Sequence, residues 1–345
     1  MKPENILEVR DLQTSFKLYE GTLRAVNHVD LTLRTGITLG IIGESGCGKS
    51  VTAHSILNTV QAPGKVEGGS VMYRTRSGQE VDLAKENPNS KFIRSIRGKE
   101  ISMIFQEPMT SMSPVYSIGQ QMIEAYLTHQ PKVTRAVRKE AEERTVEMLT
   151  RVGMQNPRQR MKDYPHQLSG GMCQRAMIAL AMMLDPAILI ADEPTIALDV
   201  SVQAQILNLL QDLKEPLKPT FLFIAHELSV IEHVSDQVGV MYVGHLVELA
   251  PTEEIYLNPR HPYTEALLSA IPRVDPIHKF KRILLPGEVA NAADLPSGCC
   301  FYPRCKYCIE RCKTEVPQWT EVSTGHYVAC HRANELELAG VEQDD

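Results

Sequence analysis

One glycine-rich run has the residue types and the spacing of a phosphate-binding loop. It reads Gly43-Glu44-Ser45-Gly46-Cys47-Gly48-Lys49-Ser50 and fits the pattern G-x-x-x-x-G-K-S without a mismatch. Glycines let successive backbone N–H groups converge on phosphate oxygens, and the following helix directs its positive end toward the same anion. In this pattern Lys49 reaches the β- and γ-phosphates, and the Ser50 hydroxyl ligates Mg²⁺. The run therefore predicts a nucleotide site.

Three further apolar runs each end in polar side chains. Gln106 follows residues 101–105, Asp192 and Glu193 follow residues 187–191, and His226 follows residues 220–225. Ligand-facing side chains of α/β proteins lie at such strand ends. In a protein with a phosphate loop, Asp192 would hold Mg²⁺ through its water shell and Glu193 would polarise the attacking water. A lone histidine is usually a hydrogen-bonding residue, but this position favours a γ-phosphate contact for His226.

A second anion-binding helix end is predicted at Ser169-Gly170-Gly171. Ser169 can cap the apolar helix that follows, and the two glycines leave its first N–H groups open to an anion. The alternative is that this segment only begins a helix.

The surrounding pattern is that of an α/β protein. Strands are expected over residues 6–12, 25–33, 39–42, 69–74, 101–105, 187–191 and 220–225, and a charged helical region over 118–152. Phe16 and Tyr19 lie near the turn between the first two strands, where strand-face packing is the ordinary role of an aromatic residue.

Composition narrows the classes of function. The chain has 345 residues, 43% of them hydrophobic, and a formal net charge of −6 without a block of Lys or Arg. These values predict a folded core and argue against nucleic acid as the main partner. We find neither signal-peptide features at the N-terminus nor an apolar run that could span a bilayer, so we expect a cytoplasmic protein.

Six of the 8 cysteines are clustered between Cys299 and Cys330. Several thiolates on one loop can surround a single soft metal centre. Four of them suit either Zn²⁺ or a [4Fe–4S] cluster, and spacing alone does not decide between these two or exclude a metal-free loop.

The order of the motifs resembles that of the nucleotide-binding subunits of ATP-binding cassette (ABC) transporters. Leu168-Ser169-Gly170-Gly171 with Gln174 matches the family signature, Ala197-Leu198-Asp199 its D-loop, Gln106 its Q-loop and His226 its H-loop. This match covers about residues 6 to 250. Further segments, at residues 104–111, 164–167, 241–244, 258–264 and 295–299, are similar to the oligopeptide/dipeptide importer ATPases and extend the resemblance through Cys330.

The resemblance implies an ATPase that works as a pair of cassettes. Two cassettes enclose two ATP molecules head to tail, and Ser169, Gly170 and Gly171 of one contact the γ-phosphate held by the other. Glu193 would be the catalytic base, and His226 would hold the γ-phosphate. Gln106 would contact Mg²⁺ beside Ser50 and Asp192. Phe16 would stack on adenine, with Tyr19 as a weaker candidate. The phosphates would contact residues of the glycine-rich run and its helix: Gly43, Ser45, Gly46, Cys47, Gly48, Lys49, Ser50 and Val51.

The subfamily resemblance also favours a [4Fe–4S] cluster, with zinc as the alternative. The matching positions are Cys299, Cys305, Cys312 and Cys330, while Cys300 and Cys308 are extra. Two residues depart from the subfamily pattern: Cys173 replaces a basic or amide residue, and Ile196 replaces Thr. Neither contacts the reacting phosphate in the family, so we expect competent hydrolysis. Cys173 is expected to be a packed, inert thiol, with an oxidisable thiol as the alternative, and Cys47 is expected to be a small filler at a variable position of the loop.

The implied fold class is α/β, a P-loop NTPase of the ABC type with a RecA-like core, an antiparallel β subdomain and a helical subdomain. We expect the ATPase domain over residues 1–250, its helical subdomain over about 108–180, and a Cys-rich extension over 251–345.

The implied function is ATP hydrolysis that powers di- or oligopeptide import at the cytoplasmic face of the cell membrane. The implied partners are a second cassette (a copy or a paralogue), two permease subunits and an extracytoplasmic solute-binding protein. The alternatives are import of oligosaccharides or metal chelates, and a soluble ABC ATPase outside transport. The net charge argues against the last alternative.

Overall fold

The computed structural model describes residues 1–2, 4–19, 21–196, 198–217, 219–271 and 282–341. The chain forms two compact units. The first contains Met1–Tyr73, Glu80–Lys85 and Phe223–Asp345, and the second contains Arg74–Gln79 and Glu86–Leu222. None of the helices in these described ranges has both the length and the apolar character that spanning a membrane requires. The domain boundaries expected from the sequence stay predictions.

A four-stranded antiparallel sheet in the first unit is built on a long hairpin. The alternation of apolar and polar residues predicted two short strands here. The structure extends them into a long hairpin that includes Phe16. The strand order is β2-β1-β4-β5, and the bounds are β1 Asn5–Leu18, β2 Gly21–Arg34, β4 Gly64–Arg74 and β5 Glu80–Asp82.

A second group of strands in the first unit positions the phosphate loop. The order is β11-β12-β10-β9-β3, in which β3 and β9 are parallel and the other neighbours are antiparallel. All five residues of β3 are buried, which agrees with the apolar run before the loop. The bounds are β3 Thr38–Ile42, β9 Gln237–Tyr242, β10 His245–Pro251, β11 Thr320–Ser323 and β12 His326–Val328.

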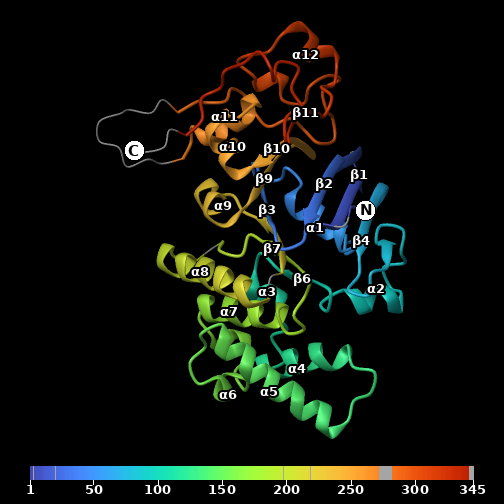
Figure 1. Ribbon diagram of the computed structural model, residues 1–345, viewed down its shortest axis with the longest axis vertical. Coiled ribbons are helices and arrows are strands. Elements are labelled where there is room, and N and C mark those ends of the chain that lie inside the picture. The colour runs from blue at the N-terminus through green and yellow to red at the C-terminus, as the bar shows by residue number, and fades with distance from the viewer. Residues whose placement is uncertain (3, 20, 197, 218, 272–281, 342–345) are drawn as a thin grey trace. The chain divides into compact units, whose positions relative to one another are not determined.

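Short helices complete the first unit. The glycine-rich run leads directly into α1, and α10, α11, α12 and the 3-10 turn η2 belong to the region after residue 250 (Figure 1). Their bounds are α1 Lys49–Ile56, α9 Leu228–Val234, α10 Thr252–Leu257, α11 Pro262–Leu268, the 3-10 turn η2 Tyr302–Arg304, and α12 Glu310–Thr314.

The second unit combines two parallel strands with most of the long helices. β6 (Ile101–Ile104) pairs with β7 (Ile188–Asp192), and every residue of both is buried. Their register ends at Ile104 and Ala191, so Phe105 lies beyond the strand and is 41% exposed. β8 (Thr220–Ile224) contains the boundary between the two units.

The charged region predicted as helical over 118–152 forms two helices, which pack against each other within the second unit (Figure 1). Pro131 separates them because proline cannot continue a helix, and Thr134 caps the second. The helices of this unit are α2 Lys91–Ile96, α3 Pro108–Ser111, α4 Ile118–Thr128, α5 Arg135–Arg151, α6 Pro157–Arg160, η1 Pro165–Gln167, α7 Gly170–Ala181 and α8 Val200–Leu217.

Candidate functional site

The glycine-rich run forms the predicted loop between β3 and α1 in the first unit. Gly48 stands before the helix with φ 104°, and a Cβ on it would lie 2.1 Å from the carbonyl oxygen of Ala25. No side chain caps the first turn of α1 at Gly48. The loop is tied back by the N–H of Gly244, which donates to the carbonyl of Cys47 at 2.8 Å. Its geometry therefore leaves the helix start available to an anion.

Lys49 brings a buried positive charge to this loop. Its side chain is 4% exposed, and Nζ donates to the carbonyls of Gly43 at 2.9 Å and Glu44 at 3.2 Å. Nδ1 of His226 lies 3.4 Å from the same ammonium. Within the described ranges these neighbours are backbone carbonyls and an imidazole, and none is a carboxylate. The positive charge of Lys49 is therefore not neutralised and can attract phosphate. The structure thus brings together two of the predicted site residues, Lys49 and His226.

Ser50 and Val51 follow in the first turn of α1, both half-buried. Ser45 and Gly46 are exposed on the loop, whereas Cys47 is buried. Burial raises the pKa of the Cys47 thiol, so this small side chain is a neutral part of the packing beneath the loop.

The second unit places Gln106 and Glu193 in direct contact. Nε2 of Gln106 donates to Oε2 of Glu193 at 2.8 Å, although the two residues are far apart in the sequence. Asp192 is 3% exposed and Glu193 is 5% exposed, both at the end of β7. The backbone of Glu193 has φ 47°, a left-handed conformation that non-glycine residues rarely adopt and that often marks functional sites. The strand end therefore holds an oriented, nearly buried carboxylate.

The signature segment begins α7, also in the second unit. Ser169 caps the helix, because its hydroxyl accepts the N–H of Met172 at 3.4 Å, as the sequence predicted. Gly170 is exposed and Gly171 is half-buried. In the D-loop, Ala197 lies outside the described residues, while Asp199 caps α8 by accepting the N–H of Val202 at 3.0 Å.

Phe16 and Tyr19 differ in their surroundings. Phe16 is half-buried in β1, where it is paired with Leu23 on one side and Gly64 on the other. Tyr19 lies beyond the strand and is fully exposed. Of the two departures from the subfamily pattern, Ile196 is 40% exposed and Cys173 is buried against Met112.

The four cysteines expected as ligands all lie in the first unit. The N–H of Cys299 donates to the carbonyl of Cys312 at 2.8 Å. A Cβ on the preceding Gly298 would lie 2.3 Å from that same carbonyl, so this close approach needs a glycine. Burial, and then the neighbouring thiolates of Cys312 and Cys330, raise the pKa of the Cys305 thiol to about 11.

Burial likewise raises the pKa of Cys330 to about 11, with Cys312 again adding to the shift. Cys312 and Cys330 therefore lie within electrostatic range of both Cys299 and Cys305. Over the described residues, no group of three or more metal-binding side chains is arranged as a ready metal site.

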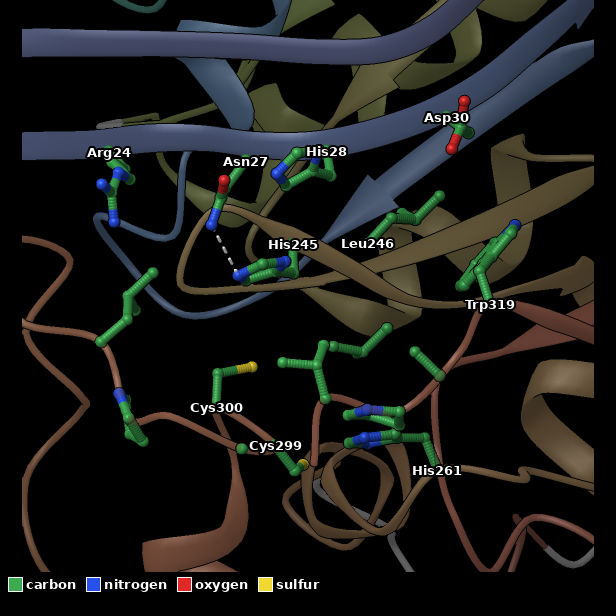
Figure 2. A pocket seen from close by; sticks show the side chains of 17 residues that line it. Arg24, Asn27, His28, Asp30, His245, Leu246, His261, Cys299, Cys300 and Trp319 are labelled. Atoms are coloured by element: carbon green, nitrogen blue, oxygen red, sulfur yellow. Dashed lines mark hydrogen bonds between the residues drawn. The ribbon is translucent and has the colours of Figure 1, made fainter. Parts of the chain in front are cut away.

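A cavity of about 530 Å³ adjoins this cluster. Figure 2 shows Cys299 and Cys300 on one side of it, opposite Arg24, Asn27 and His28 of β2. His245 faces the cavity and accepts a hydrogen bond from Nδ2 of Asn27 at 3.1 Å, so its Nε2 is unprotonated. Burial, and then His28, lower the pKa of His245 to about 4. The sequence did not predict this cavity, and none of the residues that line it belongs to the phosphate loop.

A buried carboxylate that the sequence did not single out binds residues of the region after residue 250, called the C-terminal region below. Glu248 of β10 has no exposed surface and accepts the N–H groups of Arg260 at 2.5 Å and His261 at 3.1 Å. It also bonds the hydroxyl of Thr264 and Nε2 of His326, the latter at 2.7 Å. The run at 258–264 resembles the family in sequence, and its structural role is to bind this carboxylate.

The comparisons with known proteins agree with the geometry. The model of the family described as "ABC transporter" matches residues 26–196, and that of "Oligopeptide/dipeptide transporter, C-terminal region" matches residues 247–312. An oligopeptide transport ATP-binding protein of Bacillus subtilis is 43% identical over 94% of this chain and 96% of its own. An oligopeptide transport ATP-binding protein of Salmonella typhimurium is 42% identical over 96% of this chain and 95% of its own.

A solved dimeric structure of an ATP-binding cassette bound to ADP and Pi has a TM-score of 0.62 and 23% identity, and covers 71% of this chain and 98% of that one. The likeness confirms the cassette fold expected from the sequence.

Proposed function

Because the chain belongs to the ATP-binding subunits of ABC transporters, in the group with the oligopeptide/dipeptide C-terminal region, we propose that it hydrolyses ATP to power peptide import. The similarity to peptide-import subunits extends over nearly the whole chain, which supports the import role. The observation that carries the catalytic assignment is the contact between Gln106 and Glu193 at the end of β7.

The residues of the first unit have binding roles. Gly43, Ser45, Gly46, Cys47, Gly48, Lys49, Ser50 and Val51 bind the phosphates through backbone N–H groups, the Lys49 ammonium and the Ser50 hydroxyl. His226 holds the γ-phosphate, and Phe16 stacks on the adenine ring. Lys49 exchanges its bonds to the carbonyls of Gly43 and Glu44 for bonds to phosphate oxygens, which are stronger because the acceptor is charged as well as the donor.

The residues of the second unit act on water and on the γ-phosphate. Glu193 accepts a proton from the attacking water, and Gln106 orients its carboxylate by donating a hydrogen bond. Ser169, Gly170 and Gly171 donate to the γ-phosphate of the nucleotide that a second cassette holds. The carboxylate, amide and hydroxyl oxygens of Asp192, Gln106 and Ser50 are suited to Mg²⁺. Mg²⁺ supplies charge neutralisation for the phosphates when it is bound.

The catalytic assignment is tested by Glu193→Gln. We expect ATP turnover to fall by about 10²- to 10⁴-fold, the usual contribution of a general base, with ATP still bound. Glu143→Gln, an exposed carboxylate of the same unit that pairs with Arg158, is the matched control and should turn over ATP normally. Near-normal ATP turnover in Glu193→Gln would refute the assignment of Glu193 as the catalytic base.

We further propose that Cys299, Cys305, Cys312 and Cys330 hold a [4Fe–4S] cluster, with Zn²⁺ as the alternative. Cys312 and Cys330 lie within electrostatic range of the other two thiols, and a set of four thiolates suits either group. Their pKa values are raised where a shift is resolved, and a bound cation would offset the repulsion between thiolates. A cluster supplies cross-linking of two segments far apart in the sequence, and not redox chemistry at the nucleotide.

Iron, acid-labile sulfide and zinc measured in anaerobically purified protein test the metal proposal. Cys312→Ser should lose the metal, whereas Cys308→Ser, the change of an extra cysteine, should keep it. Protein with no iron, no zinc and no visible absorption would overturn the proposal.

The proposed partners are a second cassette, two permease subunits and an extracytoplasmic solute-binding protein, with the chain at the cytoplasmic face of the membrane. Mild-detergent purification from native membranes, with identification of the copurified proteins and small molecules, tests this assembly. Permeases with bound peptide would support the proposal. A bound oligosaccharide or metal chelate would change the substrate, and ribosomal or DNA-repair partners without a permease would overturn the import role.

A further inference from the structure

The C-terminal region holds one residue of the phosphate loop by both its side chain and its main chain. Arg304, in the turn η2, donates from Nη1 to Oε2 of Glu44 at 2.7 Å and from Nη2 to Oε1 at 3.1 Å. The N–H of Glu44 donates to Oη of Tyr263, in α11, at 2.9 Å. All three residues lie in the first unit. The first turn of the loop is therefore fixed from outside the glycine-rich run.

The ion pair between Arg304 and Glu44 is partly shielded from water. The Arg304 side chain is 8% exposed and that of Glu44 is 29% exposed. The Arg304 guanidinium also lies over the ring of Tyr242, 5.9 Å from its centroid. Tyr242 and Tyr263 pack on each other with ring centroids 4.7 Å apart. This packing limits the movement of Tyr263, which binds Glu44, and of Tyr242, which lies under Arg304. Two parallel N–H···O bonds in such surroundings define one geometry.

The negative charge of Glu44 would disfavour phosphate binding if Arg304 did not neutralise it. Glu44 stands inside a loop that must bind a polyanion, and Lys49 reaches its main-chain carbonyl. A carboxylate at this place would repel phosphate if nothing neutralised it, and the repulsion would be strong because water is partly excluded. The paired guanidinium cancels the carboxylate's charge, so Lys49 and the N–H groups dominate the local field.

We propose that Arg304 is a positioning residue for nucleotide binding, which neutralises Glu44 and fixes the first turn of the phosphate loop. This rests on the proposed assignment of Gly43–Ser50 as that loop. It makes ADP and ATP affinity dependent on the C-terminal region, through a residue that directly precedes the proposed metal ligand Cys305.

Titration of Mg-ADP into the purified full-length chain tests the proposal. Arg304→Met leaves the Glu44 carboxylate unpaired. We expect the dissociation constant of this variant for ADP to be about tenfold higher than that of the wild type. Glu44→Gln introduced together with Arg304→Met removes the repelling charge and should restore the affinity to within about threefold of the wild type. A role in folding alone would not produce this rescue. The loss in Arg304→Met should also shrink between about 0.05 M and about 0.5 M salt, because screening weakens the repulsion.

Arg311→Met is the matched control, since Arg311 pairs with Glu315 on the surface of the same region, and its ADP affinity should be unchanged. If Arg304→Met does not fold, Arg304→Lys keeps the charge but not the paired geometry, and a loss of about threefold is expected. The proposal would be overturned if folded Arg304→Met bound ADP with wild-type affinity. It would also be overturned if Glu44→Gln did not restore the affinity of Arg304→Met.

Lys49→Ala separates the two levels of the proposal. It should abolish ADP binding if the phosphate loop is assigned correctly. Normal binding by Lys49→Ala would refute the proposed nucleotide site. Lost binding in Lys49→Ala together with normal binding in Arg304→Met would refute only the role of Arg304.

Discussion

The phosphate loop and the cysteine-containing loop at residues 298–312 differ in how far their determinants lie apart in the sequence. The phosphate loop is formed by a buried strand, glycines and a helix that follow one another within residues 38–56. The cysteine loop depends on Cys330 and on contacts that Glu248 makes with residues on both sides of it. A local motif thus specifies the course of the first loop, to which Arg304 and Tyr263 add remote contacts at Glu44, whereas tertiary contacts specify the second loop throughout. The two loops should therefore respond differently to remote substitutions.

The largest effect is expected for Glu248→Ala. This change removes a buried carboxylate and leaves two backbone N–H groups, a hydroxyl and His326 without their acceptor. We expect the free energy of unfolding to fall by about 3–5 kcal/mol, measured by urea denaturation. Glu253→Ala, an exposed acid in the nearby α10, should change it by less than about 0.5 kcal/mol. Equal effects of the two substitutions would show that Glu248 does not anchor the C-terminal region.

The same contrast shows how much the sequence could predict. The strand–loop–helix around Lys49, the cap at Ser169 and the polar strand ends were predicted because each depends on residues that are neighbours in the chain. The contacts of Glu44 with Arg304 and of Glu248 with His326 join residues far apart, and charge or hydropathy patterns carry no signal for such pairs. Pro131 could have predicted the break between α4 and α5, because proline is a local signal.

Acid should weaken the C-terminal region through His261. Burial lowers its pKa to about 3, and its Nδ1 accepts the N–H of Tyr263 at 3.1 Å, which requires an unprotonated nitrogen. The unfolded chain takes up a proton near pH 6.5, well before the folded one. The stabilisation is therefore complete above about pH 6.5 and is lost as the pH falls toward 3, by at most about 1.4 kcal/mol per pH unit.

The difference between the wild type and His261→Asn, which keeps a capping oxygen but does not titrate, isolates this contribution in urea denaturation from pH 7 to about 4.5. The wild type should lose about 2–3 kcal/mol more than the variant over this range. Parallel curves for the two proteins would contradict the assignment of the pH dependence to His261.

Loss of the proposed metal should weaken nucleotide binding at the phosphate loop. Since Arg304 directly precedes Cys305, freeing this cysteine should loosen the ion pair with Glu44, and Cys305→Ser should weaken ADP binding by about fivefold, or about 1 kcal/mol. Cys308→Ser is the matched control, because Cys308 is an extra cysteine of the same loop. Unchanged ADP affinity in metal-depleted Cys305→Ser would show that the two loops are independent.

The smallest effect is expected for Cys173→Ala, which separates a packed thiol from a ligand thiol. Cys173 lies within α7, has no exposed surface, and contacts Met112 with 3.8 Å between the two sulfur atoms. Burial raises its pKa, so the thiol is neutral and unreactive near pH 7. Removing its sulfur creates a small cavity, and we expect a loss of about 0.5–1 kcal/mol in the free energy of unfolding.

ATP turnover of Cys173→Ala should equal that of the wild type, because the side chain points into the packing around Met112 and Ser169 still caps the helix. Its metal content should also be unchanged, in contrast to Cys312→Ser. A turnover defect in a stably folded Cys173→Ala would mean that this departure from the subfamily pattern affects the signature helix itself. The buried thiol would then have to be counted among the residues that position Ser169, Gly170 and Gly171.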